Sequence, residues 1–336
     1  MMNMNPSFFS FLLFAFLFLT NSGISLANEL TFKPDGKFKI IQVTDCHFKV
    51  DSEYSRETIE MLQQVLDAEK PDLVVFTGDV VTCKPYRDGL DRVLDPVIKR
   101  KIPWVLLFGN HDDEYDMTRE QLATLVQAYP YHIGKMKKVK GVTGYGNFVL
   151  EIKGINRKKT QALLYCMDSN AYSTLKPVVG GYGWMAHDQV AWYRQQSMKY
   201  TSANQQQPLP ALAFFHIPLP EYRAADQQGT KITGVKLEKV CSPEINTGMF
   251  AAMLERGDVM GTFVGHDHIN DYIFNHYGIA LAYGRFSGSK TTYTELKNGV
   301  RVIELTEGQR GFDTWIRLNE EVVINQVRFP DDLPLK

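Results

Sequence analysis

The sequence has 336 residues, with 37 Lys and Arg against 38 Asp and Glu, which gives a formal net charge of −1. A chain so close to neutral has no general attraction for nucleic acid or anionic lipid, so we expect no nucleic-acid partner. Its four cysteines permit disulfides but lack the density of a disulfide scaffold, and Cys46 and Cys166, which lie in strand-like runs, are expected to be buried thiols.

The N-terminal residues are typical of a secretory signal peptide. Residues 7–20 form an apolar block rich in Phe and Leu, and Ser25-Leu26-Ala27 offers a small-x-small cleavage site. The block is short for a membrane span, but no Lys or Arg precedes it, so an uncleaved anchor is the alternative. The sequence therefore predicts a signal peptide at residues 1–27 and an exported protein, periplasmic or extracellular. It also predicts a single domain over residues 28–336, with no stable membrane span after cleavage.

Strand and helix patterns alternate through the first half of this domain. Three apolar runs have the length and composition of buried strands, at residues 38–44, 73–77 and 104–108. Between them, residues 55–69 carry an apolar helical face that Lys70-Pro71 ends, and residues 90–98 form a second helical segment with an expected kink near Pro96. This βαβαβ order predicts parallel strands joined by right-handed crossovers.

The second half of the domain is richer in strands. Thr118 and Gln121 form a capping box that predicts a helix, and residues 180–184 are expected to open another. The long irregular segment at residues 221–244 is expected to be a lid or the wall of a binding site. A last helix is expected to end at Gly257. Further strands are expected at residues 148–152, 162–167, 211–215, 259–264, 300–305, 314–318 and 322–329. The sequence therefore predicts a mixed α/β (α+β) chain with two packed β-sheets and helices outside them.

Five of the predicted strands end in His, Asp or Asn side chains. The strand ends are Asp45-Cys46-His47, Gly78-Asp79, Gly109-Asn110-His111-Asp112, His216 and Gly265-His266-Asp267-His268. Alone, residues 109–112 are equally typical of a turn that caps its own backbone. Five such ends together favour a metal site at the carboxyl edge of a sheet. In extended backbone, Asp45 and His47 would point to one side and Cys46 to the other.

In this order, the motifs resemble those of the calcineurin-like metallophosphoesterase family. Residues 42–47, 76–79, 108–112, 215–221 and 262–271 are similar to the purple-acid-phosphatase-related branch. The resemblance implies a four-layer αββα sandwich that holds two metal ions. It implies that Asp45, His47 and His268 bind the first ion, that Asn110, His216 and His266 bind the second, and that Asp79 bridges them. Purple enzymes have a Tyr three residues after the bridging Asp, where this chain has Thr82, so Mn, Fe and Zn all stay open.

The resemblance also implies hydrolysis of phosphoric esters, either monoesters or diesters, by a hydroxide that bridges the two metal ions. His111 would then be the general acid, and Asp112 would either orient His111 or cap the following loop. The expected partner is a small-molecule or phosphorylated substrate, and the oligomeric state stays open. Arg285 would contact a substrate phosphate or form a surface salt bridge. The alternatives are a catalytically silent metal- or ligand-binding module, or a dimetal hydrolase of a non-phosphate ester.

Overall fold

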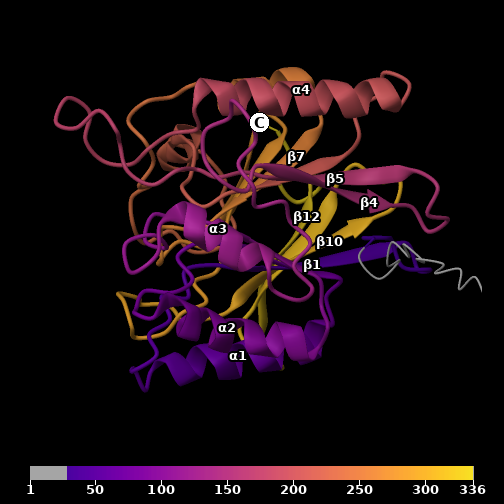
Figure 1. Ribbon diagram of the computed structural model, residues 1–336. Helices are drawn as coiled ribbons and strands as arrows, with labels where there is room; N and C mark the ends of the chain where they lie inside the picture. Colours follow the sequence, from indigo (N-terminus) through magenta and orange to yellow (C-terminus); the bar gives the residue numbers. More distant parts are fainter. Residues whose placement is uncertain (1–28, 336) are drawn as a thin grey trace, which may run out of the picture.

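A computed structural model describes residues 29–335 of the chain, so the predicted signal peptide lies outside the described residues. Two six-stranded sheets pack face to face, and helices cover their outer sides (Figure 1). The predicted αββα sandwich of two mixed sheets is therefore confirmed. Within residues 29–335, no helix combines the length and the apolar character that a membrane crossing requires.

The first sheet combines strands from both ends of the domain. Its members are β1 (Lys37–Val43), β2 (Leu73–Thr77), β3 (Trp104–Leu107), β10 (Val300–Thr306), β11 (Phe312–Arg317) and β12 (Val323–Phe329), in the order β12-β11-β10-β1-β2-β3. β1, β2 and β3 are parallel, as the βαβαβ pattern predicted, while β10 pairs with β1 in the antiparallel sense. β1 therefore lies between its sequence neighbour β2 and a strand from the far end of the chain.

The second sheet is built from the middle of the chain. It consists of β4 (Phe148–Lys153), β5 (Thr160–Cys166), β6 (Ala211–Phe214), β7 (Val259–Val264), β8 (Ile273–His276) and β9 (Ile279–Tyr283), in the order β4-β5-β6-β7-β9-β8. The four central strands are parallel, and antiparallel strands close both edges. In this topology the loops after β6 and β7 leave from the same edge of the sheet.

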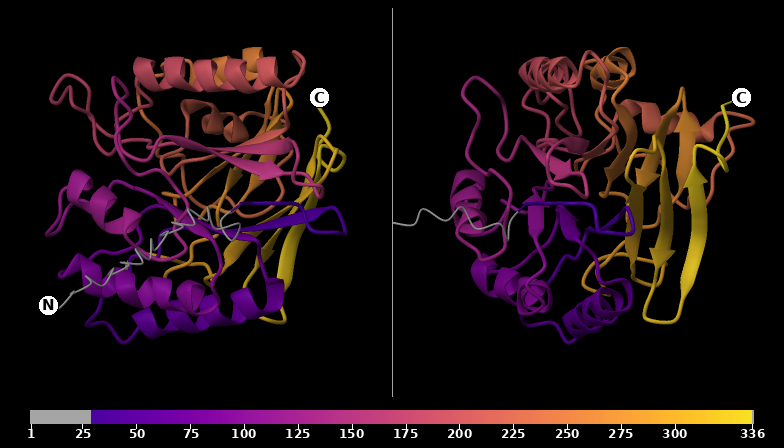
Figure 2. Two further views of the ribbon diagram at one scale, coloured as in Figure 1. Left: turned by 45° about the vertical axis from the view of Figure 1, so that its right-hand side comes forward. Right: turned by 90° about the vertical axis from the view of Figure 1, so that its right-hand side faces the viewer.

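Each sheet has its own helical layer. The helices are α1 (Ser55–Glu69), α2 (Tyr86–Lys99), α3 (Arg119–Gln127), α4 (His187–Ala203), the 3-10 helix η2 (Pro220–Asp226) and α5 (Met249–Arg256). α1 and α2 lie beside the first sheet, and α4 and α5 lie beside the second, at opposite sides of the molecule (Figures 1 and 2). A buried apolar cluster fills the space between the sheets, where Phe263 of β7 meets Phe312 of β11 with ring centroids 5.5 Å apart.

Most of the predicted elements are confirmed, and one helix start is wrong. The capping box of Thr118 and Gln121 is formed, because the Thr118 side chain accepts from the Gln121 amide and the Gln121 side chain accepts from the Thr118 amide. Residues 180–184, however, belong to a hairpin rather than to the start of a helix. α4 begins only at His187, where the Gln189 side chain accepts a hydrogen bond from the amide of Ala186.

Candidate metal centre

The polar strand ends predicted to converge do lie together in the fold. Asp45 and His47 follow β1, Asp79 follows β2, and Asn110 follows β3; His216 follows β6, and His266 and His268 follow β7. All seven side chains are buried. The two sheets therefore contribute their carboxyl ends to one buried cluster, as expected for ligands carried on parallel strands.

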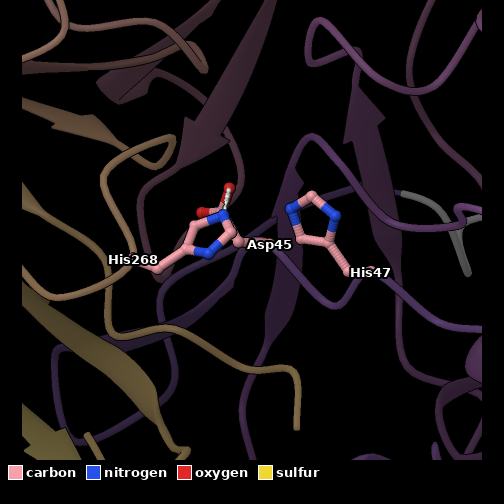
Figure 3. Close-up of side chains that lie close together, drawn as sticks. All are labelled: Asp45, His47 and His268. Carbon is pink, nitrogen blue, oxygen red and sulfur yellow. Dashed lines mark ion pairs between the residues drawn. The ribbon is translucent and has the colours of Figure 1, made fainter. Parts of the chain in front are cut away.

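Asp45, His47 and His268 form the first group of candidate ligands. One donor atom from each lies within 4.8 Å of the others, close enough for all three to contact a single ion. The Oδ1 atom of Asp45 is 3.7 Å from Nε2 of His268, and the close-up in Figure 3 shows the three side chains.

Asp79, His216 and His266 form the second group, with the same spacing of donor atoms. Oδ2 of Asp79 lies 3.1 Å from Nε2 of His216 and also 3.8 Å from Nε2 of His47, which belongs to the first group. The Asp79 carboxylate therefore faces both groups, which is the position that a bridging ligand requires.

Asn110, which the resemblance assigns to the second group, supplies a test of whether a cation fits. Its Oδ1 atom is buried, and so are Nε2 of His47 and Nε2 of His266; none of the three has a hydrogen-bond partner within residues 29–335. A buried polar atom without a partner costs free energy, so three of them in one cluster need an explanation. Imidazole nitrogens and amide oxygens with free lone pairs are metal ligands, and the donor set therefore fits bound cations.

Backbone atoms fix the orientation of two of the histidines. The Nδ1 atom of His216 lies 2.7 Å from the carbonyl oxygen of Thr77, and Nδ1 of His268 lies 3.0 Å from that of Tyr293. The Tyr293 ring also stacks on His268 with centroids 4.2 Å apart. A carbonyl only accepts, so each Nδ1 carries a proton, and Nε2 is the nitrogen of each ring that is left to bind a cation.

The backbone turns sharply at several of these ligands. The φ angles of Asp45, His47, Asp79 and His266 are 54°, 41°, 51° and 80°. The prediction of an extended segment at Asp45 and His47 is therefore wrong, although the predicted separation of the side chains is correct. Cys46 packs into the apolar core, where burial raises the pKa of its thiol and keeps it protonated.

Two glycines let the loops after β2 and β3 approach each other. A Cβ atom on Gly78 would lie 2.5 Å from the backbone nitrogen of Gly109, and a Cβ on Gly109 would lie 2.1 Å from Oδ1 of Asp79. Neither position has room for a side chain. The close approach brings the amide of His111 to 2.8 Å from Oδ1 of Asp79, which leaves Oδ2 to face the histidines.

His111 lies at the rim of the cluster, with 38% of its side chain exposed. Its ring centroid is 5.5 Å from that of His47, and its Nδ1 atom lies 2.5 Å from Oε2 of Glu114. The structure thus gives His111 a partner that the sequence reasoning missed. A proton on Nδ1 leaves Nε2 as the nitrogen available to a bound molecule.

Asp112 does not orient His111; it cross-links the loops after β2 and β3. Its Oδ2 atom accepts from the amides of Asp79 and Gly109 at 2.9 and 2.7 Å, and its Oδ1 atom accepts from the amide of Val80 at 3.0 Å and from the Tyr86 hydroxyl at 2.8 Å. The Asp112 carboxylate is therefore a positioning group beneath the cluster. Both alternatives from the sequence are wrong, because the amides that Asp112 binds belong to residues 79, 80 and 109, which precede it, rather than to His111 or the following loop.

Arg119, another residue that the sequence reasoning missed, supports the same loop from the other side. Its guanidinium donates to the carbonyl oxygen of Gly109 at 2.6 Å and to the carboxylates of Asp113 and Asp168 at 3.0 and 2.7 Å. Arg119 thereby ties the ligand loop after β3 to the end of β5. The only signal in the sequence for this role is that Arg119 directly follows the Thr118 helix cap, close to the loop after β3.

Charge is distributed unevenly over the ligands. Burial alone would raise the pKa of Asp79, but the contacts with His216 and then His47 hold that pKa well below its usual range. Burial opposes a charge on His216, yet Asp79 raises the pKa of His216 to about 9. Burial lowers the pKa of His47 and His266, so both stay neutral. A cation bound at His216 would therefore displace a proton, which makes its affinity dependent on pH.

Two other residues, Arg285 and Asp267, lie outside the cluster. Arg285 is buried and donates to Asp271 at 2.5 Å, so it is neither a surface salt bridge nor a phosphate contact. Asp267, between the two ligand histidines, points elsewhere and accepts from the Tyr283 hydroxyl at 2.5 Å. Tyr182 does line the site, with its ring centroid 4.3 Å from that of His266.

Comparisons with known proteins agree with this geometry. The family model for calcineurin-like phosphoesterases matches residues 38–270. The chain is 35% identical to the probable inactive purple acid phosphatase 14 of Arabidopsis thaliana, over 77% of this chain and 73% of that protein. It is 32% identical to the probable inactive purple acid phosphatase 29 of the same plant, over 94% and 92%. It is 33% identical to the phosphatase DCR2 of Saccharomyces cerevisiae, over 87% of this chain and 56% of that protein.

A solved structure of similar shape is the dimetal phosphatase from Danio rerio, with a TM-score of 0.60 and 13% sequence identity. The match covers 86% of this chain and 99% of the zebrafish chain. At this identity the likeness concerns the fold alone, which is again two packed sheets with flanking helices.

Proposed function

This chain belongs to the calcineurin-like phosphoesterase family, and from that membership we propose that it hydrolyses phosphoric esters with two bound metal ions. The observation that carries the proposal is the set of three buried donor atoms without partners, on His47, Asn110 and His266, within a cluster built from five strand ends. Such a cluster destabilises the fold unless something binds there.

The residues divide between two ion positions. In this proposal, Asp45, His47 and His268 hold one ion, while His216 and His266 hold the other together with the unpartnered oxygen of Asn110. Asp79 is shared, because its carboxylate faces both groups. The mixture of nitrogen and oxygen donors without a thiolate suits Mn, Fe or Zn. When bound, two such cations lower the pKa of water to about 7 and stabilise charge on the phosphoryl oxygens.

His111 is proposed as the general acid. Its exposed position at the rim leaves Nε2 open to a bound ester, while Glu114 occupies Nδ1. In its imidazolium form His111 carries a proton on each nitrogen, with Nδ1–H donated to the Glu114 carboxylate. Transfer of the Nε2 proton to the departing oxygen would neutralise the alkoxide as the P–O bond breaks and would leave His111 neutral. Proton transfer of this kind contributes roughly 10²–10⁴-fold to a rate.

A second candidate function is a silent module that binds metal or ligand on the same scaffold. The observation that favours it is that two similar plant proteins carry names describing them as probably inactive. The yeast relative, in contrast, is named a phosphatase. In this chain, the residues assigned to both ion positions and to the proton donor are all present, which supports turnover.

The experiment is a metal-by-substrate panel on the purified protein. Protein treated with EDTA is reloaded with Mn²⁺, Fe²⁺ or Zn²⁺ and assayed with p-nitrophenyl phosphate and with bis(p-nitrophenyl) phosphate. We expect two ions per chain and hydrolysis that depends on them. Two bound ions without turnover under any metal would favour the silent module, and a chain that binds no ion would refute the hydrolase and the metal-binding form of the module. Export stays a separate prediction, testable by sequencing the N-terminus of the secreted protein.

A further inference from the structure

A chain of hydrogen bonds connects Asn110 to His111 through two residues outside the ligand set. The Asn110 Nδ2 atom lies 3.2 Å from the Tyr172 hydroxyl, which lies 2.7 Å from Oε1 of Glu114. The other oxygen of Glu114 contacts Nδ1 of His111 at 2.5 Å. Asn110 and His111 are consecutive in the chain, so the backbone between them closes these contacts into a cycle at the edge of the second ion position.

The donors and acceptors in this cycle of hydrogen bonds have only one consistent arrangement. A carboxylate can only accept, so the single proton of the Tyr172 hydroxyl is donated to Glu114. The Tyr172 oxygen must then accept from Asn110, and only the amide nitrogen of Asn110 can donate. The amide oxygen is thereby turned away from Tyr172. This is the same Oδ1 atom that is buried without a hydrogen-bond partner within residues 29–335.

We propose that Tyr172 is a positioning residue that holds the amide of Asn110 with its oxygen directed at the second metal ion. The proposal rests on the proposed dinuclear function, and Glu114 gives the chain of hydrogen bonds its direction. Without Tyr172, the amide could rotate and direct its NH₂ group, which cannot bind a cation, at the ion. The role is distinct from catalysis, because Tyr172 acts only through Asn110.

The hairpin around Tyr172 explains how a half-exposed side chain can hold this position. The amide of Ser173 donates to the carbonyl oxygen of Gly181, and the amide of Gly183 donates to that of Ala171, each at 3.0 Å. These bonds place Tyr172 opposite Tyr182, with the two rings stacked 6.0 Å apart.

The ring of Tyr172 is held from a second direction, and the hairpin reaches a second ligand. Nζ of Lys176 lies 4.9 Å from the centroid of the Tyr172 ring. Tyr182 in turn packs its ring edge-on against His266. One hairpin therefore contacts two candidate ligands of the same ion, Asn110 and His266. Within residues 29–335, no hydrogen bond or ring contact joins it to Asp45, His47 or His268.

The test is metal binding by Tyr172→Phe, measured on metal-free full-length protein by calorimetric titration with Mn²⁺. We expect the dissociation constant of one of the two ions to rise by about 10–100-fold, which is typical for loss of a group that orients a ligand, while the other ion binds as in the wild type. The matched control is Tyr200→Phe, which removes a tyrosine hydroxyl that donates to Glu151 at 3.0 Å in another part of the fold. This control should bind both ions normally.

A second variant separates orientation from a general effect on the hairpin. In Asn110→Asp, either carboxylate oxygen can face the ion, so the orientation of the side chain no longer matters. Adding Tyr172→Phe to this variant should therefore raise the dissociation constant by less than about threefold. The proposal would be overturned if Tyr172→Phe weakened metal binding as much in the Asn110→Asp variant as in the wild type. It would also be overturned if Tyr172→Phe alone bound both ions with wild-type affinity. If the wild-type protein itself bound fewer than two ions, the dinuclear function would fail first, so the two failures are distinguishable.

Discussion

Asp112→Asn tests whether Asp112 holds the ligand loops together. The substitution turns one oxygen of a buried carboxylate that accepts four hydrogen bonds into an NH₂ group. If the NH₂ group replaces Oδ2, the amides of Asp79 and Gly109 both lose their acceptor. If it replaces Oδ1, the Tyr86 hydroxyl can turn and accept, and only the amide of Val80 is left without a partner.

The second arrangement is cheaper, and it sets the expected cost. One buried donor without a partner costs about 1–3 kcal/mol. Burial, and then the charge of Asp79, raise the pKa of Asp112, so removal of its negative charge recovers part of this loss. We therefore expect the free energy of unfolding to fall by about 2 kcal/mol.

The assay is urea denaturation of the metal-free protein, since bound metal would add its own stabilisation. The midpoint should fall with no change in the m-value. Tyr86→Phe is the graded control, because it removes one of the four bonds and should cost about 1 kcal/mol. If Asp112→Asn were no more destabilising than Tyr86→Phe, or if it lowered the catalytic rate at unchanged stability, the role assigned to Asp112 would be wrong.

Three further predictions concern the ligands, the proton donor and a buried histidine. Asp79→Asn should reduce the metal content measured after dialysis to one ion or none, and two full equivalents would contradict a bridging role. His111→Ala should keep both ions while kcat falls by about 10²–10⁴-fold, and an emptied ion position would contradict its assignment as the acid. Burial lowers the pKa of His132 to about 4, from 6.5 in an exposed histidine. Between pH 4 and pH 6.5 the unfolded chain therefore binds more protons than the folded state, and the folded state gains stability as pH rises. The gain is roughly 3 kcal/mol, and urea midpoints across this window should show it in the wild type but not in His132→Phe; an equally steep profile in both would refute it.

Short-range patterns were sufficient to predict the framework of this fold. The apolar face of α1 and the stop at Lys70-Pro71 gave its bounds, and the apolar runs gave β2 and its parallel neighbours. Asp79 and Asn110 could be placed together because parallel strands joined by helical crossovers end at one edge. The candidate ligands were therefore accessible from the sequence, since each follows a strand directly.

Side chains that act across loops could not be predicted in the same way. Tyr172 and Glu114 meet only because the hairpin after β5 folds over the loop after β3, and no local pattern encodes that contact. Arg285 was misjudged for a related reason: its partner Asp271 lies in the interior, and burial of a charged pair cannot be read from spacing. The glycines before Trp184 predict a helix start, but Gly181, with a φ of 69°, serves the turn of the hairpin instead.

The central place of β1 in the first sheet has a consequence for biosynthesis. β1 carries Asp45 and His47 at its end, yet one of its two neighbours is β10, which begins 257 residues after β1 ends (300 − 43). An emerging polypeptide thus holds an apolar strand with an open edge until β10 is available, a state prone to aggregation. The candidate metal centre has to wait as well, because His266 and His268 follow β7, and His266 is made 219 residues after His47 (266 − 47).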